Sequence, residues 1–361
     1  MPTPSTFKHF AMGAAMAAFT IPALAQETKK ETKKDTTAII WRQIKLNDDP
    51  REIHTSSSYS IAGVEVVQHL WDSTHLGYIQ VGMANRRAAA VPDKTISNYL
   101  QDFTQKAFGQ SFKEGGIKML WVIEAIRIGE KTGAWSEKAY FRFKGTSYGT
   151  KDGVNYVQLG VTDIVNASGG MDVTHKHKSN IVNALQDLMN RSSGALDAAF
   201  TNPTSMHTRE EIIKGYQEKR NIPALTETMN EGLYATFADF VANKPTMLEF
   251  DTKAEKRKIT VVDNNGNPVK CWGIVKKGEV YKVLENRLVP LEKYQNGYII
   301  STFVQDAQRR NAGIFWSAMA APGAAFIVEG TTRLLTADAY PNLNPSPEAT
   351  AIDMETGAFI F

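Results

Sequence analysis

Residues Ile117–Ile128 read "IKMLWVIEAIRI" and form a nearly continuous apolar run. Apolar and β-branched side chains occupy nearly every position, so a strand made from it has two faces that must both be shielded from water. We therefore expect it at the centre of a sheet. The next stretch, "KAYFRFKGTSY" (138–148), alternates Phe141 and Phe143 with polar or charged neighbours. This alternation predicts a strand with one buried and one wetted face.

Further strands are expected on both sides of this pair. The stretches "TAIIWRQIKL" (37–46), "YSIAGVEVVQHL" (59–70) and "LGYIQVGMAN" (76–85) have strand-like patterns, whereas "RRAAAVPD" (86–93) is interpreted as a loop. Asp152-Gly153 is a hairpin-turn dipeptide, and it predicts that the chain returns through "NYVQLGVTDIV" (155–165).

Two helices are expected to pack on this sheet. The first is capped by Thr95 or Ser97 and ends at Gly109. Its apolar positions at helical spacing are Ile96, Leu100, Phe103 and Ala107. The second covers about residues 174–190, with Asp172 or Thr174 as its cap and "THKHKSN" (174–180) as its first, exposed turn. Its apolar stripe consists of Ile181, Val182, Leu185, Leu188 and Met189.

The stretch "MDVTHKHKSN" (171–180) also suggests metal chemistry, because His175 and His177 lie two positions apart. Residues two apart on a helix point about 200° away from each other, so on the expected helix these two rings cannot chelate one ion together. They would share a face only if this stretch were a strand. The other histidines show no ligand spacing, and the chain contains no P-loop, G-x-S-x-G, H-E-x-x-H or C-x-x-C motif. We therefore assign no catalytic, cofactor-binding or metal-binding residue from sequence.

The second half of the chain changes its pattern. Thr208 and Glu211 have the spacing of a helix-capping box. From about residue 258 the chain then consists of short strands joined by turns, such as "KITVVD", "VKCWGIV" and "EVYKVL". We expect an α+β protein: an N-terminal mixed sheet with two packed helices (37–200), a helical connector (201–231) and a small antiparallel β-meander (232–305), followed by an apolar segment and tail (306–361).

The N-terminus predicts export. One charge, Lys8, precedes an apolar stretch at 10–20 and the small-residue triplet Ala23-Leu24-Ala25. This is the pattern of a signal peptide over residues 1–25 with cleavage after Ala25, so we expect a periplasmic or cell-envelope protein. Residues 26–36, including "ETKKETKKD", are expected to form a charged, flexible leader. Cys271 is the single cysteine, so no disulfide can form within the chain. The net charge is only +3, so the charge balance does not indicate a nucleic-acid partner.

A second apolar segment, "AGIFWSAMAAPGAAFIV" (312–328), has seventeen residues and no charge, and Pro322-Gly323 interrupts it. Two interpretations stay open. It is either a buried helix or covered loop, or a membrane-associated segment that is short for a full span.

Three stretches carry a resemblance: "GIKMLWVIEAIRIGEKTG" (116–133), "KAYFRFKGTSYGTKDGVNYVQLGVTDIV" (138–165) and "THKHKSNIVNALQDLM" (174–189). Together they resemble the β-α-β-β-α domains of auxiliary lipoproteins of envelope transport systems, although no cysteine is available for acylation. With "GLYATFADFVANKP" (232–245), "WGIVKKGEVYKV" (272–283) and "IDMETG" (352–357), the whole chain resembles uncharacterised exported proteins of Gram-negative bacteria. The resemblance implies the compartment and the order of elements.

The functional expectation is a non-enzymatic binding or structural accessory module of the envelope, whose partner is a protein or a small ligand. Aromatic side chains available for the core or for binding are Trp41, Trp71, Trp121, Trp135 and Tyr148. One alternative is a hydrolase with a site assembled from Asp72, His75 and Asp163, because "WDSTH" (71–75) places polar groups near a predicted strand end. The other alternative is an accessory protein attached to the membrane through 312–328.

Overall fold

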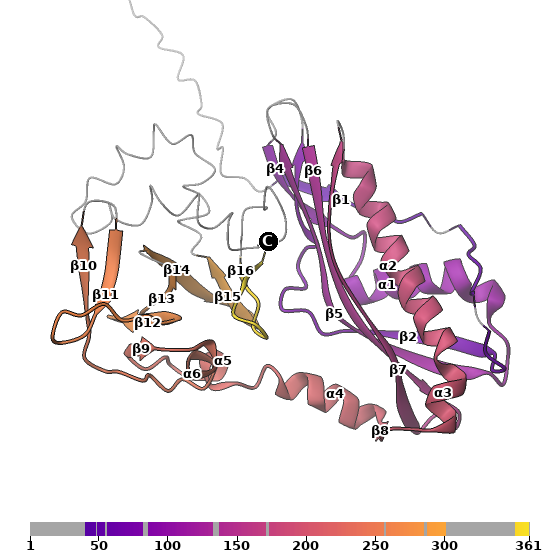
Figure 1. Cartoon of the computed structure of the whole chain (residues 1–361). Helices are drawn as coiled ribbons and strands as arrows, with labels where there is room; N and C mark the ends of the chain where they lie inside the picture. The colour runs from indigo at the N-terminus through magenta and orange to yellow at the C-terminus, as the bar shows by residue number, and fades with distance from the viewer. Residues whose placement is uncertain are drawn as a thin grey trace, which may run out of the picture. The chain divides into compact units, whose positions relative to one another are not determined.

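The computed structural model describes residues 40–300 and 351–360, apart from 48, 55, 82–85, 133–136, 171–172, 256–257 and 285–286. The predicted signal peptide, the charged leader, Trp135 and the apolar segment 312–328 lie outside the described residues. Within them the protein has an α+β fold, with one large mixed sheet and two antiparallel sheets (Figure 1). No helix of the described part is long and apolar enough to cross a membrane.

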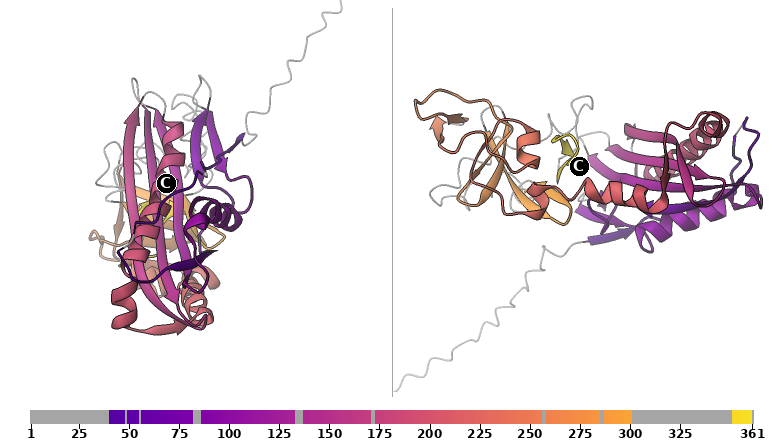
Figure 2. Two further views of the ribbon diagram at one scale, coloured as in Figure 1. Left: turned by 90° about the vertical axis from the view of Figure 1, so that its right-hand side faces the viewer. Right: turned by 90° about the horizontal axis from the view of Figure 1, so that it is seen from below.

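The large sheet is built around three long strands, β5 (Ile117–Thr132), β6 (Glu137–Thr150) and β7 (Asn155–Gly170). They form two consecutive antiparallel pairs and run side by side in Figure 2. The remaining strands are β1 (Ile40–Gln43), β2 (Ile61–Gln68), β3 (Gly77–Val81), β4 (Arg86–Val91) and β8 (Met206–Thr208). The order is β1-β4-β3-β5-β6-β7-β8, with β2 also pairing with β5, so the predicted central position of β5 is confirmed.

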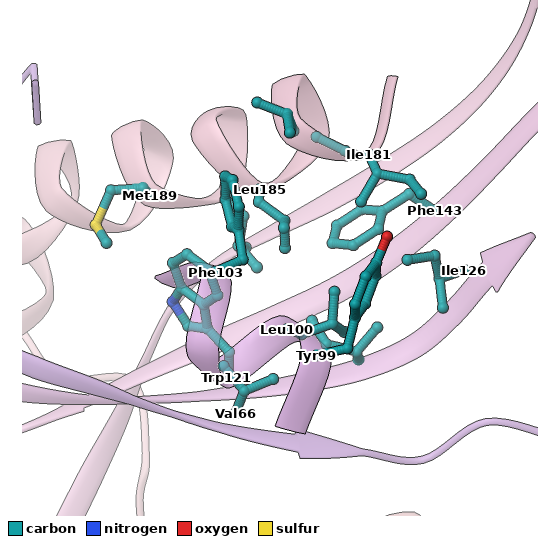
Figure 3. Packing of buried hydrophobic residues seen from close by; sticks show 14 of the residues in the cluster. Val66, Tyr99, Leu100, Phe103, Trp121, Ile126, Phe143, Ile181, Leu185 and Met189 are labelled. Atoms are coloured by element: carbon teal, nitrogen blue, oxygen red, sulfur yellow. The ribbon is translucent and has the colours of Figure 1, made fainter. Parts of the chain in front are cut away.

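Helices α1 (Ile96–Phe108) and α2 (Thr174–Gly194) cover one face of this sheet. The Thr95 hydroxyl accepts a hydrogen bond from the Asn98 backbone, which confirms Thr95 as the cap of α1. Figure 3 shows Phe103 of α1, Leu185 of α2 and Trp121 of β5 in one apolar core. These three side chains are 3 % exposed or less, so the expected burial of the helical stripes is confirmed.

The opposite face is covered along part of its length by α4 (Arg209–Glu218), which begins at the predicted capping box of Thr208 and Glu211. Ile212 and Tyr216 of α4 pack against Leu120 of β5 in a smaller apolar cluster. Leu120 and Trp121 therefore face opposite cores, which explains why β5 has no polar face in this part of its sequence. The short helices η1 (Gly109–Ser111), α3 (Leu196–Thr201) and α5 (Pro223–Thr226) lie in the connections.

A second sheet is antiparallel throughout and has the order β17-β16-β15-β14-β13-β12-β9. Its strands are β9 (Gly232–Tyr234), β12 (Gly273–Lys276), β13 (Glu279–Leu284), β14 (Arg287–Tyr294), β15 (Gly297–Ile300), β16 (Ala351–Ile352) and β17 (Phe359–Ile360). Helix α6 (Phe237–Val241) packs on it, and β10 (Asp251–Glu255) pairs with β11 (Lys258–Val262) alone. The small antiparallel meander is thus present, and it includes residues near the C-terminus.

Two predictions about secondary structure are wrong. The stretch 86–93 was expected to be a loop, but β4 occupies Arg86–Val91 between β3 and β1, where Ala88, Ala89 and Ala90 are buried. Thr174 does not cap α2, because the cap residue is Val173, and Thr174 is the first helical residue. Its hydroxyl instead donates to the Glu130 carboxylate at 3.1 Å, so a tertiary partner replaces the local one.

Candidate functional site

The candidate site forms where two strands share one edge of β5. Strand β2 pairs with the first half of β5 as far as Ile123, and β3 pairs with β5 from Ile128. The chain between β2 and β3, residues 69–76, leaves the sheet at this break. Glu124 is the extra residue of a bulge in β5 opposite β6. Breaks and bulges of this kind free polar side chains from the regular alternation of a strand, and they are common at binding sites.

Loop 69–76 is anchored to β5 by a buried polar network. Nη1 of Arg127 lies 3.3 Å from Oδ2 of Asp72, 3.0 Å from Nδ1 of His75 and 3.1 Å from the His75 carbonyl oxygen. Nε2 of His75 lies 3.4 Å from Oδ2 of Asp72 and 3.1 Å from the Tyr78 hydroxyl. Thr74 donates its backbone N–H and its hydroxyl to Oδ1 of Asp72. Each polar atom of the Asp72 carboxylate and the His75 ring therefore has a partner within the protein.

This network is a rigid support for the loop. Burial alone would raise the pKa of Asp72, but the charge of Arg127 and the interactions with His75 and Thr74 lower it overall. The carboxylate is thus charged near neutral pH and stabilises the buried guanidinium of Arg127, which is 3 % exposed. Arg127 in turn lies 4.8 Å from the Trp71 ring centre, a cation–π contact that holds Trp71 beside β5.

The structure brings together only part of the hydrolase set expected from sequence. Asp72 and His75 meet, as described above, while Asp163 of β7 forms an ion pair with Arg142 of β6. A general base needs a lone pair directed at a reacting group. Nδ1 of His75 faces a donor nitrogen of Arg127, and Nε2 faces Asp72 and Tyr78. This geometry favours a structural role for the His75 ring.

A small cleft with a volume of about 100 Å³ lies next to this network. Five cationic side chains line it: Arg127, Arg142, Lys144, Lys219 and Arg220. Three carboxylates line it as well: Glu124, Asp353 and Glu355. His69, Trp71, Asn296, Met354 and Ile360 contribute further surface, so the cleft combines charged, aromatic and apolar groups, as ligand pockets do.

Two lysines of the cleft share two carboxylates. Nζ of Lys144 lies 3.3 Å from Oε2 of Glu124 and 2.6 Å from Oε2 of Glu355. Nζ of Lys219 lies 3.2 Å from Oε2 of Glu124 and 3.9 Å from Oε1 of Glu355. Burial alone would lower the pKa of Lys144, but the hydrogen bond to Glu355 and the charge of Glu124 raise it overall. Lys144 is therefore a stable cation of the cleft.

Arg220 differs from the other four cations, because no carboxylate of the described residues forms an ion pair with it. Its terminal nitrogens donate to the backbone carbonyl oxygens of His69 and Leu70. Burial lowers the pKa of Arg220 to about 10, so the guanidinium is still charged at neutral pH. A guanidinium has five N–H donors, and two bonds leave donors for a ligand.

The ring of His69 lies beside this guanidinium. Burial and the charge of Arg220 lower the pKa of His69 to about 4, so the ring is neutral at physiological pH. The ring hydrogen-bonds to the Tyr216 backbone, and its Nε2 atom is buried without a hydrogen-bond partner. We assign the proton to Nδ1 from these contacts, which makes Nε2 an unsatisfied acceptor. Such an atom costs roughly 1–3 kcal/mol unless something donates to it.

The turn between β16 and β17 brings the carboxylate of Glu355 into the cleft. An aromatic cluster holds this turn: Cβ of an alanine at Gly357 would lie 2.5 Å from Phe237 and 2.8 Å from Trp272, and its φ of +71° favours glycine. Trp272 Nε1 and Lys282 Nζ both donate to the Gly357 carbonyl oxygen. The "IDMETG" stretch is therefore a fixed turn with Glu355 near its tip.

The histidine pair of "MDVTHKHKSN" is divided between surface and core. His175 is exposed, whereas His177 is fully buried and its Nε2 lies 2.9 Å from Oε1 of Glu130 at the far end of β5. The expectation of an exposed first turn is wrong for His177. The Glu130 carboxylate also accepts from the Gln80 backbone N–H, so this pair ties α2 to two strands of the sheet. Within the described ranges, no group of three His, Cys, Asp or Glu residues could hold a metal ion.

The sequence alone did not point to Lys144, Lys219, Arg220 or Glu355. The signal that was available is a pair of adjacent cations at the end of α4, Lys219-Arg220, just after a predicted amphipathic helix. The role of these two cations depends on contacts of Arg220 with residues 69–70 and of Lys219 with Glu355, and no local sequence pattern reveals such contacts.

Comparisons with known proteins add no functional assignment. No known family model matches the chain, and no curated protein matches it. One solved structure, described as the crystal structure of an uncharacterized protein, shares 8 % sequence identity with this chain. The match covers 43 % of this chain and 96 % of the other, with a TM-score of 0.21.

Proposed function

We propose that this chain is an exported protein of the cell envelope that acts as a non-enzymatic binding module, with the cleft described above as the site for a small anionic ligand. The N-terminal pattern of residues 1–25 supports the compartment. The saturated hydrogen bonds of Asp72 and His75 support binding rather than nucleophilic or acid–base chemistry.

The observation that carries the ligand class is the pairing of Arg220 with His69. A partly buried cation without a carboxylate partner lies beside a buried nitrogen that lacks a donor. An anionic group on Arg220 and a hydroxyl or amino hydrogen on Nε2 of His69 would satisfy both residues at once. The Trp71 ring, fixed by Arg127, provides an apolar surface for the rest of the ligand.

Calorimetric titration of the purified protein with small anions tests this proposal. Lactate, which carries a carboxylate and a hydroxyl, and inorganic phosphate are suitable probes. Saturable binding of at least one of them that disappears at high salt would support an electrostatic site. Absence of heat with both anions, in a protein that melts cooperatively, would overturn it.

A further inference from the structure

We infer that the ligand is a small organic carboxylate, and that Glu355 occupies its position in the structure without ligand. This inference rests on the proposed function and names both the chemistry and the regulation of the same cleft. The ligand would displace the Glu355 side chain from Lys144 and Lys219. In that position its carboxylate would also act on Arg220, as the charge of Glu355 does.

The geometry around Glu355 is that of a bound carboxylate. Its two oxygens face two different lysines, Oε2 at 2.6 Å from Lys144 and Oε1 at 3.9 Å from Lys219. Burial alone would raise the pKa of Glu355, but the hydrogen bond and charge of Lys144 lower it overall. The group in this position is therefore charged, and any other carboxylate must compete with it.

Of the two carboxylates on these lysines, Glu355 is the one that can leave. Glu124 lies on the bulge of β5, its side chain is 8 % exposed, and the Thr146 hydroxyl donates to it at 3.2 Å. The side chain of Glu355 is 50 % exposed at the tip of a turn. The turn itself is held without the Glu355 side chain: the Glu355 N–H donates to Oδ1 of Asp353 at 2.8 Å, and the Gly357 N–H donates to the Asp353 carbonyl oxygen at 2.8 Å. The side chain can swing out while the turn stays folded.

Glu124 also selects the charge of the ligand. Its carboxylate remains within 3.2–3.3 Å of both lysines when Glu355 departs. A monoanionic carboxylate would restore the charge that Glu355 provided. A phosphate dianion would add a second negative charge close to Glu124, where like charges repel in a partly buried site. We therefore expect carboxylates to bind better than phosphate.

The test compares the lactate affinity of the wild-type protein with that of Glu355→Gln. Glutamine keeps the size of the side chain and the turn, and it removes the competing charge. If Glu355 occupies the lysines about nine-tenths of the time, its removal tightens the apparent Kd about tenfold. Glu279→Gln, at an exposed position of β13, is the charge-matched control and should leave the affinity unchanged.

The outcomes separate the two proposals. Tighter lactate binding by Glu355→Gln, with phosphate remaining weaker, supports the inference. Lactate binding to the wild type that Glu355→Gln does not tighten overturns the inference and leaves the anion site intact, and a preference for phosphate overturns the carboxylate class. Absence of binding by either protein overturns the proposed function itself. Glu355→Ala serves as a second variant if the glutamine protein melts below the wild type.

Discussion

Arg220 donates to the backbone carbonyl oxygen of His69, while Nε2 of the same His69 is buried without a hydrogen-bond partner. The hydrogen bond to His69 fixes the Arg220 guanidinium at the edge of the cleft. The Nε2 atom of His69 is an unsatisfied acceptor next to that guanidinium. Buried polar groups are nearly always paired, so this atom needs a donor from a bound molecule. The proposed ligand would supply that donor.

The depressed pKa of His69 predicts a pH dependence of stability. The folded protein keeps this ring neutral down to about pH 4, whereas the unfolded chain protonates it near pH 6.5. The unfolded state therefore binds more protons in this window, and stability falls as the pH is lowered from about 6.5 to 4. The loss is at most about 3 kcal/mol, from about 1.4 kcal/mol for each pKa unit. Urea unfolding at a series of pH values measures it.

His69→Gln removes the titrating ring and should flatten this part of the pH profile. His207→Gln is the matched control, since His207 is exposed on β8 and should leave the slope as it is in the wild type. If the slope survives in His69→Gln, another group is responsible for it.

The anchor of loop 69–76 predicts a strong effect for Asp72→Asn. The substitution leaves the buried Arg127 guanidinium without its carboxylate, which costs about 3–5 kcal/mol in comparable buried pairs. The lowered pKa of Asp72 also shows that its charged carboxylate stabilises the folded state. This stabilisation is present above about pH 4 and is lost as the pH falls below it. Thermal or urea unfolding at pH 7 measures the loss.

Asp163→Asn is the control for this prediction. Asp163 also pairs with an arginine, but its side chain is 52 % exposed, so its removal should cost less than about 1 kcal/mol. Equal losses for the two variants would contradict the structural role assigned to the Asp72 network.

The buried contact between His177 and Glu130 predicts a further difference between neighbouring histidines. His177→Leu removes a hydrogen-bond partner from a carboxylate that is 2 % exposed, and we expect a loss of about 2–3 kcal/mol in the free energy of unfolding. His175→Leu, on the exposed side of the same turn, should change stability by no more than about 0.5 kcal/mol. An equal or larger loss for His175→Leu would contradict the assignment of His177, and not His175, to the core.

The proposed export predicts a defined N-terminus. Intact mass of the protein recovered from the cell envelope or periplasm should correspond to a chain that starts at Gln26, and replacing Ala23 and Ala25 with glutamine should block cleavage. A chain that retains Met1 in the cytoplasmic fraction would contradict this proposal.

Replacing residues 312–328 with a Gly-Ser linker of equal length, followed by an alkaline wash of the membranes, tests whether that segment attaches the protein to the membrane.

Much of the large sheet could be predicted, because its signals are local. The apolar run of β5, the alternation of β6 and the Asp152-Gly153 turn each report contacts between chain neighbours or between the two strands of one hairpin. Strand β4 was missed because alanine has a low strand propensity. Its alanines are stabilised in the strand by tertiary contacts, because β4 lies between β1 and β3 and these side chains are buried.

The cleft could not be predicted, because its parts are distant in the sequence. Lys144 and Glu355 are 211 positions apart, and Arg220 and His69 are 151 positions apart. Each is an ordinary polar residue in its local stretch, and only the fold places them together. The same limit applied to His177, whose partner Glu130 is 47 positions away.

The affinity of Arg220→Gln for lactate measures whether Arg220 holds the ligand. Lactate should bind the wild-type protein in a calorimetric titration, and the variant should lose at least about tenfold in affinity, or about 1.4 kcal/mol. Arg191→Gln, at an arginine of α2 that is 60 % exposed, should bind like the wild type and controls for the loss of one positive charge. If Arg220→Gln is folded and binds lactate as tightly as the wild type, Arg220 does not hold the ligand, and the pairing of Arg220 with His69 does not mark the anion site.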